Sequence, residues 1–294
     1  MKKNGRITLI VLAESIIASL VVRIYVIVAH TDMRTGFLYH GEDLLCNIAY
    51  YGIIAASAIV AAVTARTGRK GSLDDFPPDE IGEVKATVIG ILTMGAGLCA
   101  AYEGIAEMNA LTPTSFLIMA DFLFAAVLVC ISFLTIYKKK FTPGVGYSYS
   151  IIGVYCICRG MYCFMSRMAI VTVPEYLIEC LSLIGMSIFF VLMGRYFSGN
   201  ATRFTRKAMC FWGVGTASLV LSSGLGTLIA SVAAPEEIRS RIVFSEAAAE
   251  QFRQASAGFD AYKMVVTPWI NLVLGALIVA ALIAAFAKPR GSYN

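Results

Sequence analysis

The sequence predicts an all-α protein, a polytopic transmembrane helical bundle of eight spans with both termini in the cytoplasm. Hydrophobic residues make up 58% of its 294 residues and charged residues only 15%, whereas a soluble domain has about 25% charged residues. The apolar residues form eight runs of about 20 residues, the length that crosses a bilayer core of about 30 Å. Lys and Arg gather in alternate connections between these runs, as the positive-inside rule requires.

This composition excludes a soluble enzyme, a disordered protein and a nucleic-acid-binding module. The lipid bilayer is therefore the expected partner, and no nucleic acid is expected. Helices are the expected spanning elements, because backbone polar groups must be satisfied inside lipid and no run alternates like a barrel strand. The predicted spans of this single membrane domain, 1–294, are 7–29, 45–65, 86–108, 115–137, 149–171, 176–197, 208–233 and 264–287.

The first two spans are defined by their polar flanks. Lys2 and Lys3 precede an apolar run without a clear cleavage site, so 7–29 is interpreted as an uncleaved span rather than a signal peptide. The connection after 45–65 contains Pro77 and Pro78, which favours a surface loop. This loop is too short to be a domain.

The next four spans form two predicted pairs. Very short connections join 86–108 to 115–137 and 149–171 to 176–197, so the members of each pair should be antiparallel neighbours. Small residues spaced four apart predict a face on which helices approach closely. In the third span these residues are Ala96, Ala100 and Gly104.

The last two spans, 208–233 and 264–287, flank a predicted extracytoplasmic loop at 235–263. Pro235 followed by Glu236 is a favourable helix start. Apolar residues then recur at helical spacing, which predicts an amphipathic helix on or near the outer face. This helix is interpreted either as a spacer or as a lid or partner-binding element.

Orientation follows from the basic residues. Sixteen of the 24 Lys and Arg residues lie on one side of the predicted spans, five on the other and three within spans. The richer side is predicted to be cytoplasmic. The three residues within spans are Arg23, Arg159 and Arg167.

Most ionisable residues within the spans fall at one depth, in the outer half of the bundle. Each such group costs at least about 2.5–3.5 kcal/mol at the bilayer centre unless it is paired or hydrated. One hypothesis is a polar cavity open to the outside; the alternative is a set of ion pairs that staple the helices together. The acids are Glu103, Glu107, Asp121, Glu175 and Glu179, and they accompany the three arginines.

Arg159 is the predicted centre of any ligand site, because it is the deepest basic group and keeps its charge. An unpaired arginine in lipid is prohibitively costly, so its side chain is expected inside the bundle, near a carboxylate, helix carbonyls or water. A charged arginine between two tyrosines suits a small anionic ligand group, a carboxylate or a phosphate. The hypothetical ligand-binding residues are Arg159, Tyr155, Tyr162, Glu103, Asp121 and Arg23.

Arg167 is predicted to form a structural ion pair across the short turn that follows it. Its expected partner is Glu175 or Glu179, which begin the next span at a similar depth.

No motif supports catalysis, a metal or a cofactor. The two histidines, His30 and His40, lie at the outer end of the first span and in the loop after it, outside any His-Glu-x-x-His pattern. No Gly-x-Ser-x-Gly nucleophile elbow occurs. An enzyme therefore has no support from individual residues.

The fifth and sixth spans carry a resemblance to a known group. They read Gly153-Val154-Tyr155 up to Arg159, then Val173-Pro174-Glu175-Tyr176-Leu177, and end Gly194-Arg195-Tyr196-Phe197-Ser198-Gly199. This stretch of about 50 residues resembles uncharacterised multi-pass membrane proteins of Gram-positive anaerobes. The resemblance implies a bacterial plasma membrane and no particular chemistry.

Two functions are expected from these observations. The first is small-solute transport or ligand binding in an outward-facing polar cavity. The second is interaction or assembly with another membrane protein, with the charges acting as staples between helices.

Overall fold

The computed structural model describes residues 3–27, 43–66, 82–108, 115–138, 141–167, 174–233 and 263–286. These residues are helical almost throughout and contain no strand, which confirms the all-α class. The predicted amphipathic loop at 235–263 lies outside them except for its last residue. The helices are α1 (Lys3–Tyr25), α2 (Asp43–Arg66), α3 (Glu83–Met108), α4 (Ser115–Lys138), α5 (Pro143–Ser148), α6 (Ser150–Arg167), α7 (Pro174–Phe197), α8 (Arg203–Ala233) and α11 (Lys263–Phe286).

Seven of these helices are long and apolar enough to cross a membrane: α1 to α4, α7, α8 and α11. The prediction of an eighth apolar span at 149–171 corresponds to α6, which does not qualify by composition. The physical reason is that α6 contains Arg159 and Arg167 and is the most amphipathic of the long helices. The short helix α5, which the sequence did not predict, begins at Pro143 and leads into α6 through Tyr149 alone.

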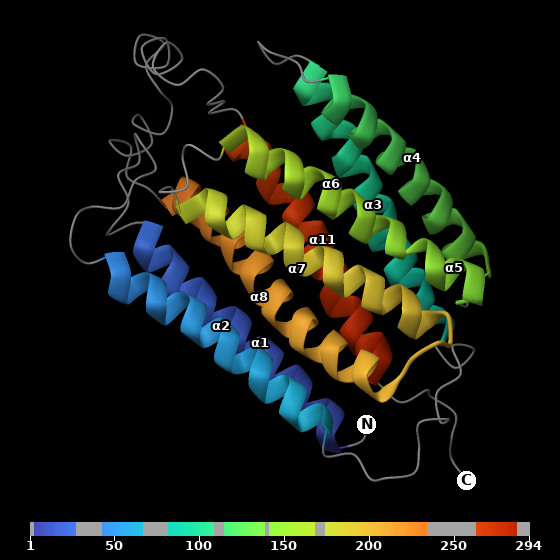
Figure 1. The fold of residues 1–294 in the computed structure, drawn as a ribbon, viewed down its shortest axis with the longest axis horizontal. Helices are drawn as coiled ribbons and strands as arrows, with labels where there is room; N and C mark the ends of the chain where they lie inside the picture. Colours follow the sequence, from blue (N-terminus) through green and yellow to red (C-terminus); the bar gives the residue numbers. More distant parts are fainter. Residues whose placement is uncertain are drawn as a thin grey trace.

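The long helices form a bundle around α8, which contacts α1, α2, α7 and α11. On the other side of α8, α11 contacts α3, which pairs with α4, and α6 pairs with α7. The two antiparallel pairs predicted from short connections are therefore confirmed. Figure 1 shows that the first turn of α1 and the last turn of α11 lie at the same end of the bundle.

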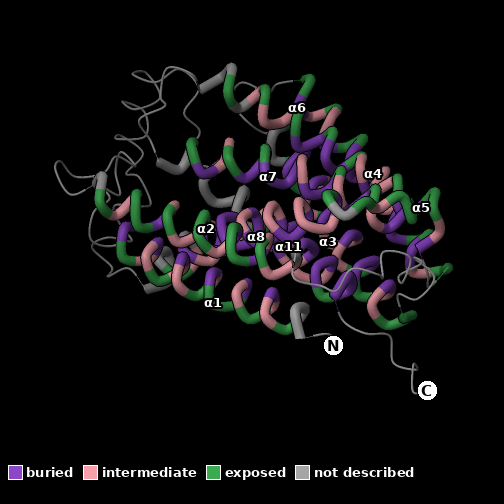
Figure 2. The backbone as a smooth tube through the Cα atoms, turned by 60° about the horizontal axis from the view of Figure 1, so that its bottom comes forward, coloured by how far each residue is buried: buried purple, intermediate pink, exposed green. Residues whose placement is uncertain are grey.

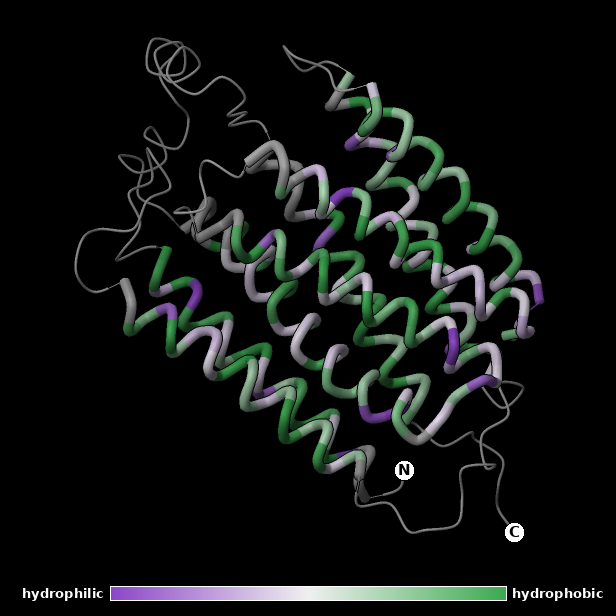
Figure 3. The backbone as a smooth tube through the Cα atoms, viewed as in Figure 1, coloured by the Kyte–Doolittle hydropathy of each residue, from purple (hydrophilic) through white to green (hydrophobic). Residues whose placement is uncertain are grey.

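The exterior of the bundle is apolar. Each of the seven qualifying helices has one segment that is long and apolar enough to cross a membrane. More than half of the residues of this segment are buried in α7, α8 and α11, but less than a third of them in α1 and α2 (Figure 2). Large apolar side chains are exposed on all eight long helices, and apolar residues predominate along these helices (Figure 3). A soluble monomer rarely exposes such continuous apolar area, so this surface suits a lipid environment.

Buried hydroxyl groups tie one end of the bundle together. The hydroxyl of Tyr149, which is fully buried, lies 3.1 Å from Oγ1 of Thr135 on α4 and 3.3 Å from Oγ1 of Thr93 on α3. The hydroxyl of Ser132 on α4 donates to the carbonyl oxygen of Gly90 on α3 at 2.7 Å. These hydrogen bonds fix the start of α6 relative to α3 and α4.

Glycines bring α5 and α6 into close contact with α7. A Cβ atom on Gly153 would lie 2.7 Å from the carbonyl oxygen of Ser187, and one on Gly146 would lie 2.6 Å from the backbone of Phe197. Real Cβ atoms do not approach other atoms so closely, so these positions require glycine. The same feature recurs between α7 and α8, where Gly185 faces Thr216.

We expect Gly153→Ala to destabilise the protein, because the new methyl group would push α6 away from the backbone of α7. Overpacking of this kind costs about 1–3 kcal/mol. Gly52→Ala on α2 is the matched control, because no atom lies within 4 Å of its Cβ position and alanine is the better helix former. Thermal unfolding in detergent should rank Gly153→Ala below the wild type and Gly52→Ala at or above it. Equal melting temperatures for the two variants would contradict the close contact.

Candidate functional site

Arg159 lies midway along α6, and its side chain points into the bundle with 18% of its surface exposed. Its Nη1 atom forms an ion pair with Oε2 of Glu103 on α3 and a second one, at 3.3 Å, with Oδ1 of Asp121 on α4. Both carboxylates are buried. The arginine thus connects three helices through a single nitrogen.

Tyr155 completes this cluster one helical turn before Arg159. Its hydroxyl group donates to Oδ1 of Asp121 at 2.5 Å and accepts a hydrogen bond from Nη1 of Arg159 at 2.7 Å. Its ring stacks on Phe124 of α4, with the ring centroids 3.7 Å apart and the planes within 5°. Because Asp121 and Phe124 are three residues apart on one face of α4, both position the same tyrosine.

Glu103 is held less completely than Asp121. Its side chain is only 6% exposed. Oε2 faces Arg159, whereas Oε1 has no hydrogen-bond partner among the described residues. A buried oxygen of this kind lacks the solvation it had in water, so Glu103 is the incompletely satisfied member of the cluster.

The three polar contacts of Arg159 with described residues, to Glu103, Asp121 and Tyr155, all use Nη1, and none involves Nη2 or Nε. The guanidinium group carries five N–H donors in a planar fork. Arg159 also borders a narrow pocket between α6, α7 and α11, whose other polar members are Tyr155, Glu179 and Asn271. The pocket has room for about one water molecule in this conformation. Nη2 and Nε of Arg159 therefore have no hydrogen-bond partner among the described residues, and they lie beside a small, mostly apolar pocket with a few polar members.

The cluster lies near one end of the bundle. Glu103 is five residues before the end of α3, Asp121 six residues after the start of α4, and Glu179 five residues after the start of α7. At 1.5 Å per residue these positions are about 8–9 Å from the helix ends. The common depth expected from the sequence is therefore found for these three acids.

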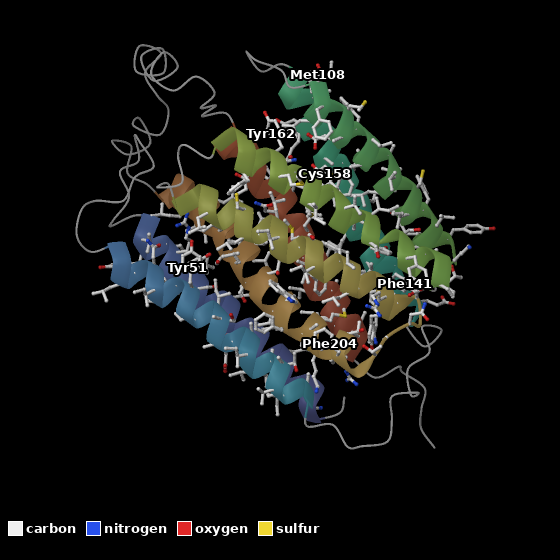
Figure 4. The ribbon with its side chains drawn as sticks, in the orientation of Figure 1. Tyr51, Met108, Phe141, Cys158, Tyr162 and Phe204 are labelled. Carbon is white, nitrogen blue, oxygen red and sulfur yellow. The ribbon has the colours of Figure 1, made fainter. Side chains whose placement is uncertain are left out.

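The structure brings together four of the six predicted ligand-binding residues: Arg159, Tyr155, Glu103 and Asp121. The half-buried Tyr162 lies three residues beyond Arg159, toward the end of α6 that is nearest Met108 (Figure 4). The side chains of Arg167, Glu175 and Glu107 lie outside the described residues. The predicted ion pair of Arg167 with Glu175 or Glu179 therefore stays a prediction.

The structure places Arg23 apart from the other predicted ligand-binding residues. Arg23 is 2% exposed and lies against α8, where a Cβ on Gly226 would be 2.9 Å from its Cγ. Its helix, α1, packs mainly against α2 and α8, whereas the cluster is built from α3, α4 and α6. The position of Arg23 in its apolar run predicted a depth similar to that of the cluster. It did not indicate that α8 and α11 lie between α1 and the helices of the cluster.

Sequence reasoning missed two residues of the site. Asn271 is the only asparagine in α11, and it stands alone within the apolar segment from Trp269 to Phe286. An isolated polar residue in such a segment could have indicated it. Phe124 carried no signal, because one more aromatic residue in an apolar helix is ordinary. Among the described residues, no three His, Cys, Asp or Glu side chains converge in a way that could hold a metal ion.

Comparison of the chain with known protein families, curated proteins and solved structures finds no match. The class of protein is therefore defined by its own fold and site: an all-α bundle with seven helices long and apolar enough to cross a membrane and a buried ionic cluster at one end. Its function is inferred from these features alone.

We expect Tyr155→Phe to lower the melting temperature in detergent. The substitution keeps the stack on Phe124 but removes a hydrogen bond to the buried Asp121, at a cost of about 1–3 kcal/mol. Tyr102→Phe on α3 is the control, because Tyr102 is 53% exposed. If both phenylalanine variants unfold together with the wild type, the hydrogen bonds of Tyr155 contribute nothing to stability.

Proposed function

We propose that the protein is an eight-span integral protein of a bacterial plasma membrane that binds a small solute at the Arg159 cluster and moves it across the membrane. The bacterial membrane is inferred from the resemblance to multi-pass proteins of Gram-positive anaerobes. Topology, binding and transport are supported by separate observations, given in turn below.

The eight-span topology is supported by the arrangement of the helices. The start of α1 and the end of α11 share one end of the bundle (Figure 1), as an even number of crossings requires. The excess of Lys and Arg on that side supports a cytoplasmic location for both termini. Helix α6 is included as a span because its polar face is directed at α3 and α4 by Arg159 and Tyr155, while apolar residues such as Ile151, Val154 and Ile157 face outward.

We expect a reporter enzyme that is active only outside the cytoplasm to be inactive when fused after residue 294. The same reporter inserted within the 109–114 connection should be active, because an odd number of spans precedes it. The amount of each fusion protein in the membrane should be measured, so that a low reporter activity is not caused by low expression. Activity of the C-terminal fusion would overturn the topology.

Solute binding is supported by one observation above the others: donors of Arg159 that have no partner among the described residues lie beside a small pocket that also contains Glu179 and Asn271. Ion pairs that serve only as staples need no unused donors and no adjoining pocket. A planar guanidinium edge suits a carboxylate or phosphate group, which it can bind through two parallel hydrogen bonds. Asn271 on α11 adds an amide at the same pocket. A small anion is therefore the proposed ligand class.

Movement of the solute is supported by the position of the cluster. The site lies between helix pairs, α3 with α4 and α6 with α7, that are joined to each other mainly through other helices. Such pairs can rock around a fixed binding site, as in alternating access. The narrow pocket then corresponds to a closed conformation that widens to admit the solute.

We expect Arg159→Lys to distinguish a role of Arg159 in ligand binding from a purely structural role in ion pairs between helices. The lysine keeps a positive charge for Glu103 and Asp121 but cannot bind an anion through two parallel hydrogen bonds. Purified protein would be heated in detergent with and without acetate or inorganic phosphate as probes. The wild type should be stabilised by at least one probe, and Arg159→Lys should need about tenfold more of it, a loss of about 1.4 kcal/mol.

The control for this experiment is Arg195→Lys, because Arg195 is exposed near the end of α7. It should respond to the probes like the wild type. A large loss of stability in Arg159→Lys without any probe effect in the wild type would favour the staple and overturn the binding site.

The second candidate function is assembly with another membrane protein, and Glu14 favours it. This glutamate is exposed in the middle of α1, between the exposed apolar side chains of Ile10 and Ile17. A carboxylate facing lipid is costly, and a basic or hydroxyl group on a partner helix would lower that cost. Under this hypothesis the Arg159 cluster only stabilises the contacts between helices. Arg159→Lys would then lower stability, and neither probe would stabilise the wild type.

A further inference from the structure

We propose that Glu103 is a proton-binding residue and that a solute anion binds to Arg159 together with a proton on Glu103. The first part stands on the geometry of the cluster. The second part rests on the proposed function and names what accompanies the solute.

The cluster holds more acid than base. One guanidinium group, that of Arg159, contacts two buried carboxylates, so the ionised cluster carries a net charge of about −1. Glu179 borders the adjoining pocket and adds to the negative side. The other titratable groups near Glu103 among the described residues are the neutral hydroxyl of Tyr155 on α6 and the thiol of Cys99, one turn earlier on α3. No second cation contacts the cluster among the described residues.

A net negative charge in an apolar bundle is costly, and one added proton removes it. Protonation takes a proton from hydronium, releases a water molecule and changes the charge of the cluster from −1 to 0. The proton must then reside on one of the two carboxylates.

The hydrogen bonds select Glu103 as the proton acceptor. Oδ1 of Asp121 accepts from both Tyr155 and Arg159, and such donors favour the ionised form of a carboxylate. Oε1 of Glu103 is buried and accepts from no described residue, so the neutral form costs less there. The ion pair through Oε2 occupies only one of its two oxygens.

Proton binding and anion binding should reinforce each other. An anion at the free edge of Arg159 would meet a cluster that is already negative, and repulsion would oppose binding. With a proton on Glu103 the charge of Arg159 is balanced by Asp121 alone, so the anion meets a neutral cluster. By linkage, the anion must favour the proton to the same extent. Uptake of the anion would therefore consume one proton.

We expect infrared difference spectra of the purified wild type, recorded between alkaline and acidic pH without any solute, to contain the carbonyl band of a buried carboxylic acid. Glu103→Gln should lose this band, because the amide cannot titrate. Asp121→Asn leaves Glu103 as the only described acid paired with Arg159, so the band should still belong to Glu103 but should appear only at a lower pH than in the wild type. Glu14→Gln is the matched control: it removes another carboxylate from the middle of a helix and should leave the band of Glu103 in place.

A band that persists unchanged in Glu103→Gln, or a wild type without any such band, would overturn the proposal. If Glu103→Gln does not fold, Glu103→Asp retains an acid at a different distance from Arg159. The band should then shift in frequency, and an unshifted band would equally overturn the assignment.

The coupling is tested separately with acetate or inorganic phosphate as the probe. Affinity of the wild type should fall about tenfold for each pH unit above the transition of the infrared band, as release of one proton requires. Glu103→Gln should bind the probe with little dependence on pH. Proton titration without probe binding would overturn the coupling and the proposed function but not the proton site. Probe binding that is independent of pH in the wild type would overturn the coupling alone.

Discussion

The architecture of the site depends on the need to compensate one permanent positive charge inside an apolar bundle. Arg159 cannot lose its proton and lies too far from either end of α6 to reach water easily. It is stable there because Glu103, Asp121 and Tyr155 converge on its Nη1 atom from α3, α4 and α6. Removal of one partner from such a set leaves the others uncompensated, at a cost of about 3–5 kcal/mol. In this conformation the cluster therefore links α3, α4 and α6.

The rest of the bundle is organised so that this convergence is possible. Gly153 brings α6 against the backbone of α7, and Tyr149 links the start of α6 to α3 and α4 through hydroxyl groups. Helix α6 is thus held by polar contacts at two points, at Tyr149 directly before its first residue and at Arg159 in its middle. The excess of carboxylates over arginines has a second consequence under the proposed function: a proton that binds together with the anion offsets the charge of the anion, so that binding adds no further net charge to the bundle.

Much of the cluster could be predicted from the sequence, and the errors have a common cause. Depth along an apolar run follows from the rise of a helix, so Arg159, Glu103 and Asp121 were correctly placed at neighbouring levels. The tyrosine at four residues from Arg159 was placed on its face by helical periodicity. Depth does not define which helices are neighbours, and for that reason Arg23 was assigned to a site from which α8 and α11 separate it. Asn271 was overlooked for the same reason, since only packing brings α11 to α6.

The sequence by itself determined the all-α class, the positions of the long helices and the antiparallel pairing of α3 with α4 and of α6 with α7. These features depend on local quantities: apolar run length, backbone hydrogen bonding and the length of connections. Only the tertiary structure decided that α8 packs between α1, α2, α7 and α11, and that Gly153 and Gly185 lie at close contacts between helices. It also decided that donors of Arg159 without a partner among the described residues lie beside a pocket with Asn271. Those features depend on side-chain packing between helices that are distant in the chain, and an apolar helix of uniform composition does not encode its neighbours in its own pattern.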